Sequence, residues 1–168
     1  MRKTRILGQG LEVSAIGLGC MGMDHAYGAP ADREEMIKLI RHAVTLGCNF
    51  FDTAVVYGEA NEVLLGKALE IFPRDEVIIA TKFGIYGQEI VDGKPQNILN
   101  SKPDSIREQL EGSLKRLGVD YIDLYYQHRV DPEVEPEIVA SVMKELIAKG
   151  KIKHWGLSNA PLDYLKRA

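Results

Sequence analysis

The chain has 168 residues, of which 45% are hydrophobic, and a formal net charge of -3 at pH 7. This length and composition predict one globular domain over residues 1–168 that buries a substantial hydrophobic core. Its 21 basic and 24 acidic residues are nearly balanced and scattered along the chain. That distribution argues against a nucleic-acid or membrane partner and favours a small-molecule partner.

The first residues contain no long apolar stretch, which argues against a secretory signal or a membrane anchor and predicts a cytoplasmic protein. Cys20 and Cys48 are the two cysteines. Neither belongs to a CxxC motif or has a histidine at metal-ligand spacing. We therefore expect two reduced structural thiols and no metal site.

Short β-branched segments alternate with longer segments of helical period, a pattern typical of parallel βαβ units. A hairpin is predicted around residues 7–11, and the first strand over residues 15–19. The first helix follows, because Asp32 and Glu35 have the spacing of a capping box. Gly47 suits the left-handed residue just past the end of that helix.

The second strand is predicted over residues 49–53, the second helix over 61–70 and the third strand over 77–82. The next segment, which contains Asp92 and Gly93, is interpreted as a loop of about twenty residues. A loop of that length is uncommon without a function. A lid or a binding loop is one interpretation of it.

Pro103 is expected to begin the third helix and Gly118 to end it, because proline suits a first turn and glycine a C-terminal cap. The fourth strand is predicted over residues 121–128. Pro136 begins the fourth helix and Gly150 ends it.

The fifth strand is predicted over residues 152–157, and a fifth helix begins near Pro161. The total is about four and a half βα units after an N-terminal β-hairpin. A closed (β/α)8 barrel needs eight strands and about 250 residues. The predicted fold class is therefore α/β, an incomplete TIM-type barrel.

Ionisable side chains end three of the predicted strands: Asp52, Lys82 and His128. Tyr57 lies in the loop after Asp52. Taken singly, they have ordinary interpretations: a turn or helix cap, a strand-end lysine, a rim histidine and an exposed loop aromatic. Because the carboxyl ends of parallel strands meet at one rim, we expect the four to form one cluster.

The chemistry of such a cluster follows from its groups. Tyrosine is a weak acid near neutral pH, but a neighbouring ammonium favours its ionised form and makes it a better proton donor. Lys82 is the candidate ammonium, and Asp52 would hold it charged and fix its direction. His128 would donate a hydrogen bond to a carbonyl oxygen. The cluster indicates a proton relay suited to carbonyl reduction.

Several segments in order along the chain resemble motifs of the aldo-keto reductase family. They are residues 17–22 (GLGCMG), 50–54 (FFDTA) with Tyr57 and Gly58, 80–82 (ATK), 120–124 (DYIDL), His128, and 156–159 (GLSN). The resemblance extends from about Lys3 to the last residue. The variants at 20–23 and 127–131 look most like the bacterial and plant branch that acts on assorted aldehydes.

The resemblance implies hydride transfer from NADPH to an aldehyde or ketone, with Tyr57 as general acid tuned by Asp52 and Lys82. His128 would orient the carbonyl group. The matching cofactor positions are Gly19, Met21, Asp52, Ser158 and Asn159, of which Ser158 and Asn159 would bind the nicotinamide carboxamide.

The glycines of residues 17–22 also fit GxGxxG, the pattern of a Rossmann dinucleotide site. No Asp or Glu is predicted to end a neighbouring ribose-binding strand, however, as that site requires. Cofactor binding by a barrel is therefore the favoured interpretation.

In the resembling family, later strands supply a glutamine beside the nicotinamide and basic residues for the adenosine 2′-phosphate, and this sequence has no counterpart of them. Two open strand edges are expected, and such edges favour a homo-oligomer. The alternative to a reductase is a catalytically silent half-barrel or an interaction module.

Overall fold

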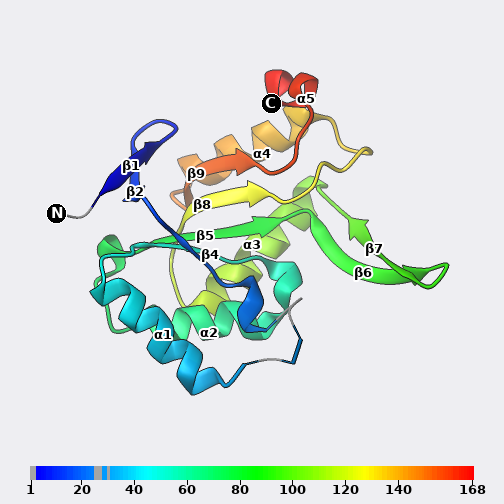
Figure 1. The fold of residues 1–168 in the computed structure, drawn as a ribbon. Helices are drawn as coiled ribbons and strands as arrows, with labels where there is room; N and C mark the ends of the chain where they lie inside the picture. Colours follow the sequence, from blue (N-terminus) through cyan, green and yellow to red (C-terminus); the bar gives the residue numbers. More distant parts are fainter. Residues whose placement is uncertain (1–2, 25–27, 30) are drawn as a thin grey trace.

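A computed structural model describes residues 3–24, 28–29 and 31–168. Its central feature is a parallel sheet in which spatial order follows sequence order. The strands are β3 (Leu18–Gly19), β4 (Phe50–Asp52), β5 (Ile78–Phe83), β8 (Ile122–Gln127) and β9 (Ile152–Leu157). The helices α1 (Arg33–Thr45), α2 (Glu59–Leu69), α3 (Pro103–Leu117), α4 (Pro136–Ala148) and α5 (Leu162–Arg167) alternate with them. This succession confirms the predicted class, a partial TIM-type barrel (Figure 1).

The two faces of the sheet have different roles, because side chains alternate along each strand. On the outer face Phe51, Ile79 and Tyr125 are fully buried in the main core beneath the helices. Asp52 and Lys82 have the opposite parity and line the hollow of the inner face. The same strands therefore supply core side chains on one face and candidate catalytic side chains on the other.

The helix ends follow their sequence signals. The Asp32 side chain accepts a hydrogen bond from the Glu35 backbone N–H at 2.9 Å and caps α1. Pro103 occupies the first turn of α3, and Gly118 takes the left-handed conformation at its C-terminal cap, with φ 68°. The predicted start of α1 and both ends of α3 are thereby confirmed.

The N-terminal hairpin consists of β1 (Thr4–Leu7) and β2 (Leu11–Ser14), paired antiparallel. Its buried apolar side chains, Leu11 and Val13, pack against Ala80 and Leu124 of the inner sheet face. Figure 1 shows the hairpin near the starts of the strands. It covers the end of the sheet opposite the candidate site.

The first barrel strand is shorter than predicted, because only β3 within residues 15–19 pairs with β4. The Ser14 side chain donates to the Ile16 carbonyl at 2.8 Å and forms a local turn. A Cβ atom on Gly17 would lie 2.8 Å from the Phe50 ring. The chain bends here to lead from the hairpin into the sheet.

The predicted loop of about twenty residues is wrong. It forms a second hairpin, β6 (Ile85–Val91) and β7 (Lys94–Leu99), which extends away from the sheet in Figure 1. Asp92 and Gly93 both have positive φ, 50° and 75°, as a two-residue type I′ hairpin turn requires. The Asp-Gly pair is thus the turn of the hairpin.

Three short 3₁₀ helices complete the described chain: η1 (Met21–Met23), η2 (Val55–Tyr57) and η3 (Arg74–Glu76). Across the part of the chain that the structure describes, no helix is long and apolar enough to span a membrane. In the same residues, no three His, Cys, Asp or Glu side chains are grouped as metal ligands.

Candidate active site

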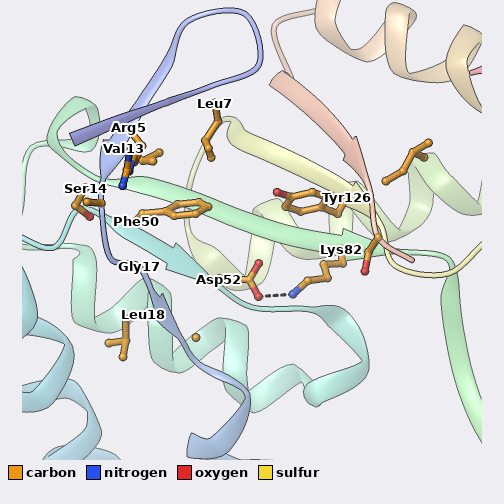
Figure 2. A pocket seen from close by; sticks show the side chains of 14 residues that line it. Arg5, Leu7, Val13, Ser14, Gly17, Leu18, Phe50, Asp52, Lys82 and Tyr126 are labelled. Atoms are coloured by element: carbon orange, nitrogen blue, oxygen red, sulfur yellow. Dashed lines mark hydrogen bonds and ion pairs between the residues drawn. The ribbon is translucent and has the colours of Figure 1, made fainter. Parts of the chain in front are cut away.

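The core of the site is an ion pair between the ends of two adjacent strands. Asp52 ends β4, and Lys82 is the penultimate residue of β5. The Lys82 ammonium pairs with Asp52, as Figure 2 shows, and donates to the Thr53 carbonyl at 2.8 Å. Lys82 is buried. A buried ammonium needs such partners, and these two fix its position.

Tyr57 comes to this ion pair from the segment after β4. It is the last residue of η2, and Gly58 follows with φ 100°, a conformation that glycine adopts readily. The Tyr57 hydroxyl lies 3.4 Å from Lys82 Nζ. The ammonium therefore faces the phenol oxygen, which is the contact that the predicted proton relay requires.

His128 completes the cluster from the end of β8. Its backbone N–H donates to the Phe83 carbonyl at 2.8 Å, and its ring meets that of Tyr57 edge-on, with centroids 5.9 Å apart. Burial, and then the Lys82 and Arg129 charges, lowers the pKa of His128 to about 4. At neutral pH the imidazole is uncharged and retains one N–H donor.

Four further predicted residues belong to this rim or its immediate chain neighbours. Gly19 and Ser158 line the same cavity as Asp52 and Lys82. Met21 lies in η1, two residues after Gly19. Asn159 is exposed and has φ 56°, a left-handed conformation that is costly for most residues and often marks a functional site. The structure does not place Met21 or Asn159 in the cavity lining.

The cavity has a volume of about 540 Å³ and runs along the inner face of the sheet. Figure 2 shows Arg5 and Val13 of the hairpin at one end and Asp52 and Lys82 at the other. In a closed barrel, layers of side chains fill this space. The Asp52–Lys82 ion pair therefore lies at the mouth of an open barrel interior, while Tyr57 and His128 are not among the residues that line the cavity.

Asn61, predicted only as a helix start, is a buried connector behind the cluster. It accepts from the Thr53 hydroxyl at 2.6 Å and donates to the Cys20 carbonyl at 2.9 Å. It thus connects the end of β4 with the segment that leads to Met21. The available signal was a polar pair, Asn61 and Glu62, directly before an apolar helical segment.

Cys20 itself is a poor nucleophile. Its side chain is buried, and burial, with a contribution from the Asp52 charge, raises the pKa of the thiol to about 12. The thiol stays protonated at neutral pH, so Cys20 packs as a small apolar side chain.

The sequence model of the aldo/keto reductase family matches residues 15–168. The chain belongs to this family. A probable aldo-keto reductase of Glycine max is 48% identical over 161 residues, which are 95% of this chain and 45% of that protein. The chain thus spans less than half of this curated relative.

Solved aldo-keto reductases share the fold of the chain. The holo form of an aldo-keto reductase from Bacillus halodurans has a TM-score of 0.84 and 33% identity over 100% of this chain and 55% of its own. An aldo-keto reductase from Klebsiella pneumoniae in complex with NADPH has a TM-score of 0.79 and 29% identity over 99% and 53%. The chain therefore has the fold of part of an aldo-keto reductase barrel.

Proposed function

We propose that the chain carries the catalytic end of an NADPH-dependent reductase of aldehydes or ketones. The observation that supports this most is the contact of Lys82 Nζ with the Tyr57 hydroxyl at 3.4 Å, beside the Asp52 ion pair. A proton donor and its activating cation stand together at the carboxyl ends of parallel strands, where barrel enzymes have their active sites.

In this proposal Tyr57 is the general acid that protonates the carbonyl oxygen as it becomes an alkoxide. Lys82 stabilises the phenolate left behind, and Asp52 keeps the ammonium directed at Tyr57. Uncharged His128 donates a hydrogen bond to the same carbonyl oxygen, which orients it for protonation.

The rim residues fit the nicotinamide end of the cofactor. Gly19 leaves open space, since a Cβ atom there would meet nothing within 4 Å. Ser158 and Asn159 supply a hydroxyl and an amide that can bind a carboxamide, and the proposal assigns Met21 and Asp52 to the same end. When bound, NADPH would supply the hydride.

The test combines cofactor binding with turnover. NADPH binding is followed by the fluorescence of Trp155, the single tryptophan of the chain, and reduction of 4-nitrobenzaldehyde by the loss of NADPH absorbance. The Tyr57→Phe variant should bind NADPH like the wild type but turn over about 10²–10⁴ times more slowly, the usual contribution of a general acid.

Tyr86→Phe is the matched control, because Tyr86 is exposed on the second hairpin. Turnover that survives in Tyr57→Phe would contradict the role of the phenol. Failure of the wild type both to bind NADPH and to reduce aldehydes would instead favour the silent half-barrel. The open cavity behind the cluster is the observation that favours the silent half-barrel.

We also propose that a second copy of the chain covers the open sheet edges. Among the described residues β3 pairs only with β4 and β9 only with β8. Near the β3 edge, Ile16 and Leu46 are 81% and 76% exposed. Unpaired edges with apolar neighbours favour association. Light scattering should show a dimer or larger species, and a well-folded monomer would contradict the proposed association.

A further inference from the structure

Arg129 is a cation at the catalytic rim that the proposed mechanism does not use. It follows His128 directly and is half-buried. Its Nη1 donates to the His128 carbonyl at 2.6 Å and lies 3.5 Å from the Ser158 hydroxyl. The side chain therefore extends along the rim from the end of β8 towards the end of β9, beside the cluster.

The Arg129 charge has no counterion within the structurally described chain, since none of the ion pairs there includes it. Asp131, two residues along, is already engaged by the backbone N–H groups of Ser101 and Glu133, at 2.8 and 3.0 Å. A half-buried guanidinium without a carboxylate retains most of its five donors for a ligand.

The charges of the neighbouring groups also favour an anionic ligand. Lys82 and Asp52 neutralise each other, and His128 is uncharged at neutral pH. Together with Arg129 these groups carry one net positive charge, although the whole chain carries -3. An anionic group is therefore favoured locally at a rim of an acidic protein.

We propose that Arg129 binds the carboxylate of the substrate, and that the preferred substrates are aldehydes or ketones that also carry a carboxylate group. This inference rests on the proposed reductase function. It assigns Arg129 to substrate specificity, outside the proton relay. Guanidinium and carboxylate match as planar, bidentate partners.

The experiment separates anion binding from turnover. Benzoate and, in parallel, inorganic phosphate are titrated into the cofactor-free chain, and the His128 imidazole resonances are followed by NMR. Arg129→Gln removes the charge, and Arg129→Lys keeps the charge without the planar fork. Arg41→Gln is the matched control, because Arg41 lies on α1 and donates to the Ala68 and Lys67 carbonyls at 3.1 Å.

Benzoate should bind the wild type and Arg41→Gln equally, and Arg129→Gln about ten- to a hundredfold more weakly, with Arg129→Lys in between. Equal binding to Arg129→Gln, no binding to the wild type, or a preference for phosphate would each overturn the proposal. In turnover assays the wild type should prefer 4-carboxybenzaldehyde to its methyl ester, and Arg129→Gln should show no such preference. Loss of all turnover would count against the reductase function, while the benzoate result would still decide the role of Arg129.

Discussion

The Lys82 ammonium lies 3.4 Å from the Tyr57 hydroxyl, although 25 residues separate the two along the chain. β4 pairs with β5, so the end of β4 at Asp52 lies beside Lys82 near the end of β5. Tyr57 follows β4 in η2 and so comes close to Lys82. The Thr53 carbonyl and Asp52 also bind the ammonium. The contact therefore depends both on the register of β4 with β5 and on η2, the segment that carries Tyr57.

Lys82→Met should remove the cation that stabilises the Tyr57 phenolate while keeping most of the apolar stem. If the reductase function is correct, kcat/KM for an uncharged aldehyde falls at least about a hundredfold, as expected for lost assistance to a general acid. Lys94→Met, at the exposed start of β7, is the control and should be unaffected. Steady-state kinetics measure both, and a Lys82→Met enzyme of normal kcat/KM would refute the role.

The lowered pKa of His128 predicts how stability changes with pH. The unfolded chain binds the imidazole proton near pH 6.5, but the folded chain binds it only near pH 4. Between these values the unfolded state binds more protons, so stability falls as pH falls. Relative to pH 7, His128 should lower the free energy of unfolding at pH 4.5 by roughly 2 kcal/mol.

The comparison with His128→Gln isolates this contribution, since the carboxylates titrate in both proteins. Urea denaturation at pH 7 and pH 4.5 should show a smaller pH-dependent loss of stability in His128→Gln than in the wild type. An equal loss in the two proteins would mean that the folded imidazole titrates normally.

The sequence predicted the barrel elements well where one physical signal dominated. The capping box of α1 and the proline and glycine of α3 placed those ends correctly, because each satisfies local backbone groups. The cluster of Asp52, Lys82 and His128 followed from strand ends alone. These features depend on local chemistry and on the common direction of parallel strands.

Features that depend on tertiary contacts were not predictable in the same way. β3 pairs with β4 only at Leu18 and Gly19, and Gly17 just before it lies close against Phe50, which is distant in the sequence. The second hairpin was missed although Asp92 and Gly93 are a strong turn signal, because its strands are polar and mostly exposed and lack clear alternation. Asn61 and Glu62 begin the predicted second helix, where polar residues are common, yet both are buried.

Glu62→Ala should strongly destabilise the fold. Glu62 is fully buried and accepts hydrogen bonds from the Thr81 hydroxyl and from Arg116 Nε, both at 2.7 Å. Removing it leaves the mostly buried Arg116 guanidinium with only the exposed Glu59 carboxylate, 3.9 Å away, as a counterion. Breaking a buried ion pair in this way costs about 3–5 kcal/mol. Glu70→Ala removes a partner of an exposed ion pair with Lys67 and should cost less than about 1 kcal/mol. Urea denaturation compares the two, and similar losses would contradict this account of the buried pair.

The two helical glycines Gly66 and Gly112 should respond differently to substitution by alanine. A Cβ atom on Gly66 of α2 would lie 2.3 Å from the Leu117 carbonyl oxygen of α3, which is backbone and cannot rotate away. The helices would have to separate, and such overpacking costs about 1–3 kcal/mol. At Gly112 the nearest atom, at 2.8 Å, is the end of the flexible Arg116 side chain.

Gly112→Ala should therefore change stability little or raise it by up to about 1 kcal/mol, because alanine restricts the unfolded chain and favours helix. Thermal and urea denaturation of both variants measure the difference. The Arg116 side chain has to shift slightly while keeping its bond to Glu62, which limits the gain at Gly112. If Gly66→Ala proved as stable as the wild type, α2 and α3 would not be in the close contact that positions Glu62 behind the rim.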